Sequence, residues 1–250
     1  MPSTRMLASV VSPEEAEIVL NAGVEIVDLK NPAEGALGAL PLETVRAIVD
    51  SVDNRAIVSA TIGDQPIDQP MGPALLVDKT REMLSTGVDI VKIGFFGQSA
   101  HESCLHALQE VAEQGAKLIA VVFADMSPNL ALLDKIAAAG FYGVMLDTAK
   151  KDGRHLLTHC SLGELNNFVT KAHSLGLQVG LAGALTKNHV ESLLKLKPSY
   201  MGFRSALCDQ SKRTATLNPK QVKELVVLMH QQPDEEACSA FVNNASYALI

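Results

Sequence analysis

The chain has 250 residues, a formal net charge of −7 and 47% hydrophobic residues, but only 4% aromatic residues and no tryptophan. This acidic balance offers no positive field to a polyanion, which argues against nucleic acid as a partner. The four cysteines are scattered without a CxxC pair, and neither a signal peptide nor an apolar span of about 18 residues is found. We therefore expect a cytoplasmic protein with reduced thiols that does not cross a membrane.

Eight short apolar runs alternate with amphipathic stretches between residues 6 and 207. The runs are MLASVV from Met6, VEIVDLK from Val24, AIVSATIG from Ala56, DIVKIGF from Asp89, KLIAVVF from Lys117, GVMLDTA from Gly143, QVGLAGA from Gln178 and YMGFRSAL from Tyr200. This alternation is typical of βα units around a parallel sheet. It predicts an α/β fold with a single (β/α)₈ TIM barrel. An open, doubly wound sheet is disfavoured, since no phosphate-binding glycine motif follows the first run.

Helix signals fill the segments between these runs. After the first run, Ser12 is suited to cap a helix, Pro13 to occupy its first position and Gly23 to end it. A glycine recurs just before several later runs, as at Gly87 and Gly140. We predict a barrel domain over residues 1–230, followed by a C-terminal extension over 231–250 that shows no clear periodicity.

Charged residues stand late in three of the predicted strands. Active sites in this fold form at the carboxyl ends of the strands, so such positions carry functional weight. Asp28 and Lys30 share one face of the second strand because side chains alternate along it. Lys92 lies among apolar neighbours in the fourth strand. Asp147 ends the sixth, with Lys151 just beyond it. Three lysines and two aspartates are thus expected at one barrel mouth.

Clustered, buried lysines favour chemistry on a carbonyl group. Burial beside other cations lowers the pKa of an ammonium group, which leaves free amine to form an imine. The alternative is that each Lys–Asp couple is only a structural ion pair. The placement of the charges at strand ends favours the catalytic reading.

Candidates for phosphate binding lie in the last two units, where barrels of this type often hold phosphate. Gly183 follows the seventh run, and the eighth contains Gly202, Arg204 and Ser205. The glycines would let backbone N–H groups approach a phosphate, and Arg204 could grip it with two N–H groups. Arg204 could instead clamp a carboxylate for structural reasons.

The remaining polar motifs are weaker. His155 and His159 are spaced four residues apart without an HExxH pattern, which favours an exposed pair over a metal site. We predict no metal and no cofactor. Asp64 and Asp125 follow strands but stand beside turn residues, so they are expected to shape loops.

Several segments together resemble a known family: DLKNPAEGALGA from Asp28, VSATIGD from Val58, DIVKIGFFG from Asp89, MLDTAKKDG from Met145, and then LAGALTKNHV and MGFRSALC. They resemble the (5-formylfuran-3-yl)methyl phosphate synthases of methanofuran biosynthesis. The resemblance spans most of residues 6 to 230 and leaves the tail uncovered. It implies a (β/α)₈ barrel lyase that condenses two molecules of glyceraldehyde 3-phosphate with loss of phosphate and water.

Residue by residue, the resemblance implies that Lys30 is the Schiff-base lysine and Lys92 the proton acceptor. Asp28, Asp147 and Lys151 match the family's other charged positions. One departure follows the eighth run, where SALCDQSKRTATL replaces a glycine-rich stretch of the family. This departure affects the expected phosphate contacts and not the lysine chemistry.

Two other functions remain open from the sequence. One is a class I aldolase acting on another sugar phosphate, and the other is a non-catalytic barrel that binds a phosphorylated metabolite. In each case the expected partner is a small phosphorylated molecule. A homo-oligomer is compatible with the sequence, which does not indicate the oligomeric state.

Overall fold

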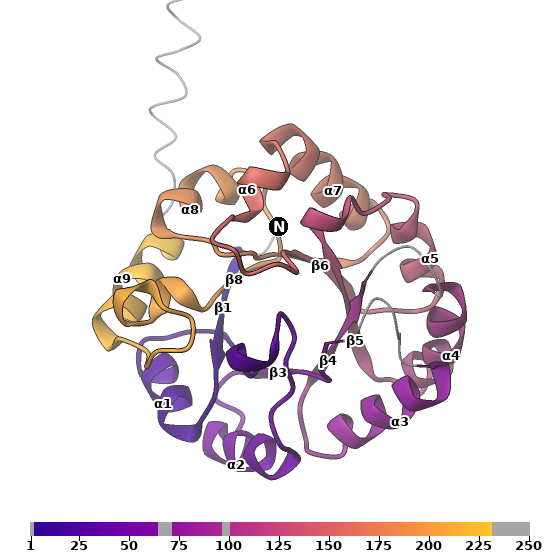
Figure 1. Cartoon of the computed structure of the whole chain (residues 1–250), viewed down its shortest axis with the longest axis horizontal. Coiled ribbons are helices and arrows are strands. Elements are labelled where there is room, and N and C mark those ends of the chain that lie inside the picture. The colour runs from indigo at the N-terminus through magenta and orange to yellow at the C-terminus, as the bar shows by residue number, and fades with distance from the viewer. Residues whose placement is uncertain (1–2, 65–71, 97–100, 232–250) are drawn as a thin grey trace, which may run out of the picture.

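The structure is a computed structural model that describes residues 3–64, 72–96 and 101–231. Eight parallel strands form a closed barrel in sequential order, with β8 paired to β1. Figure 1 looks down this ring, with the helices arranged outside it. The strands are β1 (Arg5–Val10), β2 (Ile26–Leu29), β3 (Ile57–Thr61), β4 (Ile90–Phe95), β5 (Lys117–Phe123), β6 (Gly143–Asp147), β7 (Gln178–Leu181) and β8 (Tyr200–Phe203). The predicted TIM barrel is confirmed: each predicted run coincides with one strand, and only β1 begins before its run, by one residue.

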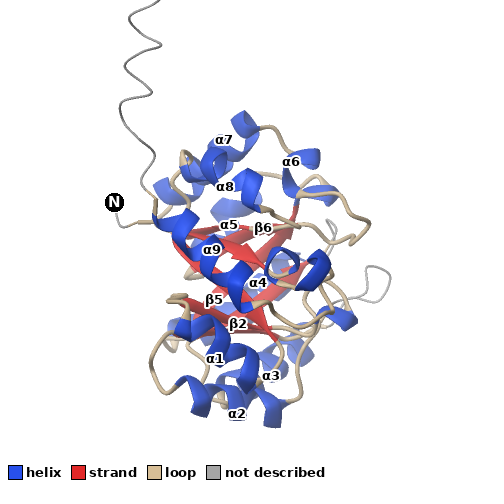
Figure 2. Cartoon of the chain, turned by 90° about the vertical axis from the view of Figure 1, so that its left-hand side faces the viewer, coloured by secondary structure: helices blue, strands red, loops and turns tan. Residues whose placement is uncertain are grey.

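Helices follow the strands and cover the outside of the barrel, as the side view in Figure 2 shows. They are α1 (Pro13–Asn21), α2 (Leu42–Val52), α3 (Pro73–Leu84), α4 (His101–Glu113), α5 (Leu132–Ala138), α6 (Leu156–His159), α7 (Leu162–Ser174), α8 (Lys187–Leu194) and α9 (Pro219–His230). Short α6 is an addition to the regular alternation, placed between β6 and α7. Within the described ranges, no helix combines the length and the apolar character needed to cross a bilayer.

The local signals in the sequence have the expected structural effect. The Ser12 side chain accepts a hydrogen bond from the backbone N–H of Glu15 at the start of α1, and Pro13 occupies the first turn. Gly23 has a φ of 88°, a left-handed conformation that other residues adopt at a cost. Helix α9 ends at His230, so the extension predicted for 231–250 lies outside the described residues, except for Gln231.

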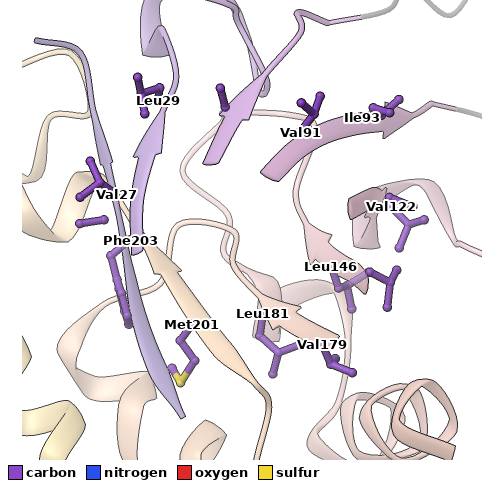
Figure 3. Close-up of a cluster of buried hydrophobic side chains, with 14 of the residues drawn as sticks. Val27, Leu29, Val91, Ile93, Val122, Leu146, Val179, Leu181, Met201 and Phe203 are labelled. Atoms are coloured by element: carbon purple, nitrogen blue, oxygen red, sulfur yellow. The ribbon is translucent and has the colours of Figure 1, made fainter. Parts of the chain in front are cut away.

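The core has two layers because side chains alternate along each strand. Outward side chains such as Val27 and Leu29 pack under the helices, and Figure 3 shows part of this layer. Ile26 instead belongs to a second apolar cluster, which also includes Leu7, Ile90, Ile119, Val121, Met145 and Tyr200. With apolar side chains filling this inner layer, the polar side chains gather toward the carboxyl ends of the strands.

Strand register brings three polar residues to the same level. Asp28 in β2 is opposite Ser9 in β1 and Ser59 in β3. All three are almost completely buried. A buried carboxylate is costly unless it is hydrogen bonded or paired with a cation, and the site described next meets this requirement.

Candidate active site

The five charged residues singled out in the sequence come together at the carboxyl end of the barrel. Four of them, Asp28, Lys30, Asp147 and Lys151, line a cavity of about 360 Å³. Lys92 reaches the group from β4, with 1% of its side chain exposed. The structure therefore brings together the three lysines and two aspartates, which lie in strands β2, β4 and β6 or shortly after β2 and β6.

Asp28 is the most densely bonded member of the group. Its carboxylate lies 2.6 Å from Lys92 Nζ and accepts hydrogen bonds from Ser59 Oγ at 2.7 Å and Ser9 Oγ at 3.0 Å. Burial acts to raise the pKa of Asp28, but the charges of Lys92 and Lys30 outweigh it and hold that pKa below its ordinary value. Asp28 is thus an ionised carboxylate held in one orientation, with Lys92 as its salt-bridge partner.

A second pair lies on the other side of the cavity. Lys151 Nζ is 3.3 Å from Asp147 Oδ1, and the same oxygen accepts the backbone N–H of Thr148 at 2.7 Å. Burial acts to raise the pKa of Asp147, yet the nearby ammonium groups of Lys151 and Lys30 lower it overall. Lys151 also donates to the carbonyl of Thr148, so it is held at the cavity wall by two groups.

Lys30 differs from both neighbouring lysines. Within the part of the chain that the structure describes, its amine forms no hydrogen bond and no salt bridge, although the residue is only 9% exposed. Burial lowers the pKa of Lys30 from 10.5 to about 8; Asp147 and Asp28 oppose this, and the charge of Lys92 adds to it. Of the three lysines of this group, Lys30 is therefore the one whose amine is not held by a carboxylate in the described structure.

The glycines proposed for phosphate binding lie next to this cavity. Gly202 lines it, and an added Cβ there would come within 2.8 Å of Met145 Cε. Gly183 has a φ of 106°, and a Cβ there would lie 2.9 Å from Thr148 Cγ2. Ser205 also lines the cavity. The glycines keep the β7 and β8 ends close to β6, and binding of a phosphate there remains a prediction.

The guanidinium of Arg204 is bound by groups of the protein itself. Its guanidinium pairs with the buried Glu15 at 2.5 Å and donates to the carbonyls of Ser9, Arg213 and Ala215. Together with a second bond to Glu15, these contacts use all five N–H donors of an arginine. Of the two roles considered for Arg204, the structure supports the structural clamp.

Replacing Arg204 by alanine is consequently expected to destabilise the barrel and not simply to raise KM. The variant would leave the Glu15 carboxylate buried without its partner, which typically costs about 3–5 kcal/mol. Urea unfolding of the variant measures this loss. A matched double variant, Arg204→Met with Glu15→Gln, should recover most of it because no buried charge is left. Wild-type stability with a raised KM would return Arg204 to phosphate binding.

Sequence reasoning missed or undervalued several residues at the site. Ser9 and Ser59 belong to no motif. Both are polar residues in apolar strands at the level of Asp28, and this is the signal that could have identified them.

Asp64 and Asp125 shape loops as expected. Asp64 accepts the N–H groups of Ala36 and Leu37 in the loop after β2. Asp125 does the same for Ala149 and Lys150 in the loop after β6.

The histidine motif does not form the exposed pair that was expected. The ring of His155 lies 4.3 Å, centroid to centroid, from that of His189, and His155 Nδ1 is buried. Among the described residues, no group of three or more potential ligands is placed to hold a metal ion.

Known proteins resemble this chain both in sequence and in fold. In fold, it resembles phosphoribosyl anthranilate isomerase from Thermus thermophilus, with a TM-score of 0.65 at 13% identity, covering 90% of this chain and 98% of that one. A 3-hexulose-6-phosphate synthase gives a TM-score of 0.58 at 15% identity, over 89% of this chain and 99% of that one. At such identities the likeness concerns the barrel alone.

The sequence comparisons are more specific. An Archaeoglobus fulgidus (5-formylfuran-3-yl)methyl phosphate synthase is 34% identical, covering 90% of this chain and 99% of its own length. A Methylorubrum extorquens protein, to which the same activity is provisionally ascribed, is 39% identical over 93% of this chain and 94% of its own. The family model for 4-HFC-P synthase matches residues 6–226. The chain therefore belongs to the 4-HFC-P synthase family.

Proposed function

We propose that this chain condenses two molecules of glyceraldehyde 3-phosphate into (5-formylfuran-3-yl)methyl phosphate, with release of phosphate and water, in the biosynthesis of a methanofuran-type cofactor. Membership of the family supports the product. The observation that carries the mechanism is Lys30, a buried amine without a hydrogen-bonding partner in the described structure and with a pKa lowered to about 8. Such an amine is suited to form an imine with an aldehyde.

The first step is attack of the Lys30 amine on the aldehyde carbon of one substrate molecule, with loss of water to give the imine. With a pKa of about 8, roughly a tenth of the amine is neutral at pH 7, whereas an ordinary lysine has well under a thousandth. The lowered pKa therefore increases the reactive fraction by more than a hundredfold. Lys92 and Lys151 are instead each paired with an aspartate.

Later steps require protons to move near the imine. The two ion pairs, Lys92 with Asp28 and Lys151 with Asp147, both act electrostatically on Lys30 and supply ammonium donors and carboxylate acceptors. Removal of a proton next to the imine carbon gives an enamine, which adds to the aldehyde of the second molecule. As placed, Lys92 is a donor in an ion pair, so it accepts a proton only after passing its own to Asp28 or to the substrate.

The test is to incubate the protein with glyceraldehyde 3-phosphate and sodium borohydride and to locate the adduct by peptide mass spectrometry. We expect it on Lys30, because reduction fixes an imine as a stable secondary amine. A parallel incubation without borohydride should release phosphate and build up furan absorbance. An adduct on Lys92 or Lys151 would contradict the assigned nucleophile.

The products also separate this function from the two alternatives. An adduct on Lys30 without furan or phosphate would indicate a class I aldolase for another sugar phosphate. Neither adduct nor product, in a protein that still binds the substrate, would indicate a non-catalytic binding barrel.

A further inference from the structure

Basic side chains outnumber their acidic partners at the cavity. Six basic side chains belong to it or lie directly beneath it: Lys30, Lys92, Lys151, Arg154, Arg204 and Arg213. Four of them are in salt bridges: Lys92 with Asp28, Lys151 with Asp147, Arg154 with Asp152, and Arg204 with Glu15. Among the described residues, Lys30 and Arg213 have no salt-bridge partner. Since Lys30 is the amine for the aldehyde carbon, Arg213 is the other positive charge at the cavity without a salt bridge among the described residues, and the charges of Asp147 and Asp64 act on it at longer range.

Arg213 follows the short helix η4 (Asp209–Ser211) in the segment between β8 and α9. Its side chain is half-buried and lines the cavity together with Ser205 and Ser211. Nη2 donates one hydrogen bond, at 2.7 Å, to the carbonyl of Gly35. An arginine has five N–H donors, so Arg213 has donors beyond this bond, unlike Arg204, whose donors are all used.

The Gly35 carbonyl is a firm anchor for this side chain. Gly35 lies in the loop that follows Lys30 and has a φ of 104°. A Cβ at this position would lie 1.8 Å from Asp64 Oδ2, so a side chain there would displace the Asp64 carboxylate and would strain the backbone at this positive φ. The next two residues, Ala36 and Leu37, donate their N–H groups to Asp64. Arg213 is thus fixed at one end to the loop after Lys30, and its remaining donors are oriented before a ligand binds.

We propose that Arg213, and not Arg204, binds the phosphate group of the aldehyde that reacts with Lys30. A guanidinium presents two parallel N–H groups that match two phosphate oxygens, and its charge offsets that of the dianion. The hydroxyl groups of Ser205 and Ser211 line the same cavity and can add hydrogen bonds. This inference rests on the proposed function in that the substrate is a phosphorylated aldehyde.

The contact with Gly35 gives this binding a second consequence. The phosphate would be bound by a side chain that is hydrogen bonded to the loop after Lys30. This hydrogen bond would limit the variation of the distance between the phosphate and the Lys30 amine. A phosphorylated aldehyde is then positioned for attack, whereas an aldehyde without phosphate gains nothing from Arg213.

The experiment measures binding of glycerol 3-phosphate, an analogue without an aldehyde, by isothermal titration calorimetry. Arg213→Gln removes the charge and keeps a shorter polar side chain, and Lys212→Gln is the matched control on a neighbouring exposed residue outside the cavity. We expect about 10- to 100-fold weaker binding for Arg213→Gln, the loss typical of a charge-assisted bidentate contact. Lys212→Gln should bind as the wild type does.

Borohydride trapping provides a readout for the positioning role. Arg213→Gln should slow trapping by glyceraldehyde 3-phosphate and leave trapping by unphosphorylated glyceraldehyde unchanged. Arg213→Lys, which retains a charge without the two-pronged geometry, should give intermediate affinity and serves if the glutamine variant does not fold. Unchanged affinity in the variants, or a wild type that does not bind glycerol 3-phosphate, would overturn the proposal. If glycerol 3-phosphate binds in an Arg213-dependent way but the protein makes no furan, the proposed reaction is contradicted and this inference is supported.

Discussion

Replacement of Lys30 by methionine should abolish furan formation while leaving the barrel folded. Methionine keeps the apolar stem but provides no amine, so no imine forms. Loss of a covalent nucleophile that works with its neighbours as a unit lowers kcat by at least about 10⁴-fold. Phosphate release from glyceraldehyde 3-phosphate measures the loss, and Lys150→Met, at an exposed lysine outside the cavity, is the control. Substantial activity in Lys30→Met would mean that another amine forms the imine.

The same variant should be more stable than the wild type at neutral pH. The pKa of Lys30 falls from 10.5 to about 8 on folding, and each pKa unit corresponds to 1.36 kcal/mol, so the buried ammonium costs about 3 kcal/mol. The full cost applies below pH 8, where Lys30 is protonated in both the folded and the unfolded protein. It declines between pH 8 and 10.5, because there the folded protein releases the proton first.

Urea unfolding at pH 7 and at pH 10 measures this difference. The stability advantage of Lys30→Met over the wild type should shrink as the pH rises between these values. A stability advantage that does not change with pH would mean that folding does not lower the pKa of Lys30 strongly. The lowered pKa would then no longer support Lys30 as the nucleophile.

Replacement of Lys92 by methionine should reduce activity by roughly 10²–10⁴-fold, the range associated with a group that donates or accepts protons. It should also destabilise the protein. The Asp28 carboxylate, buried and paired with Lys92 at 2.6 Å, would retain only the hydroxyl groups of Ser9 and Ser59, and breaking a buried pair typically costs about 3–5 kcal/mol. Adding Asp28→Asn should restore much of the stability but not the activity.

The pH dependence of kcat/KM gives a second measure for Lys92. In the wild type, kcat/KM should rise with pH toward a plateau above pH 8, since the free Lys30 amine is the reactive form. Lys92 lowers the pKa of Lys30 and Asp147 raises it. The rise should therefore move to higher pH in Lys92→Met and to lower pH in Asp147→Asn.

Shifts in the same direction would contradict this account of the site. A soluble, folded Lys92→Met with nearly full activity would make Lys92 only a salt-bridge partner of Asp28. The proton transfers would then fall to Asp28, Asp147 or Lys151.

The amino-acid sequence by itself determined the barrel and the orientation of its strands. β-branched runs of four to seven residues became the strands, and the glycine at 23 ended its helix, because both depend on local backbone preferences. Alternation along β2 also placed Asp28 and Lys30 on the inner face. The position of these charged residues late in apolar runs was enough to predict that they cluster at the carboxyl end of the barrel.

Only the tertiary structure decided which charges pair and which stay free. Closure of the barrel sets β8 beside β1, so Arg204 contacts Glu15, 189 residues earlier in the chain. The residues next to Arg204 in the sequence therefore do not show whether it binds a carboxylate or a phosphate. Arg213 contacts Gly35 across a separation of 178 residues for the same reason. Pairing depends on distances between side chains from different strands and loops, and local patterns contain no information on those distances. That the Lys30 amine has no salt bridge among the described residues is likewise a result of where Asp28 and Asp147 find their partners.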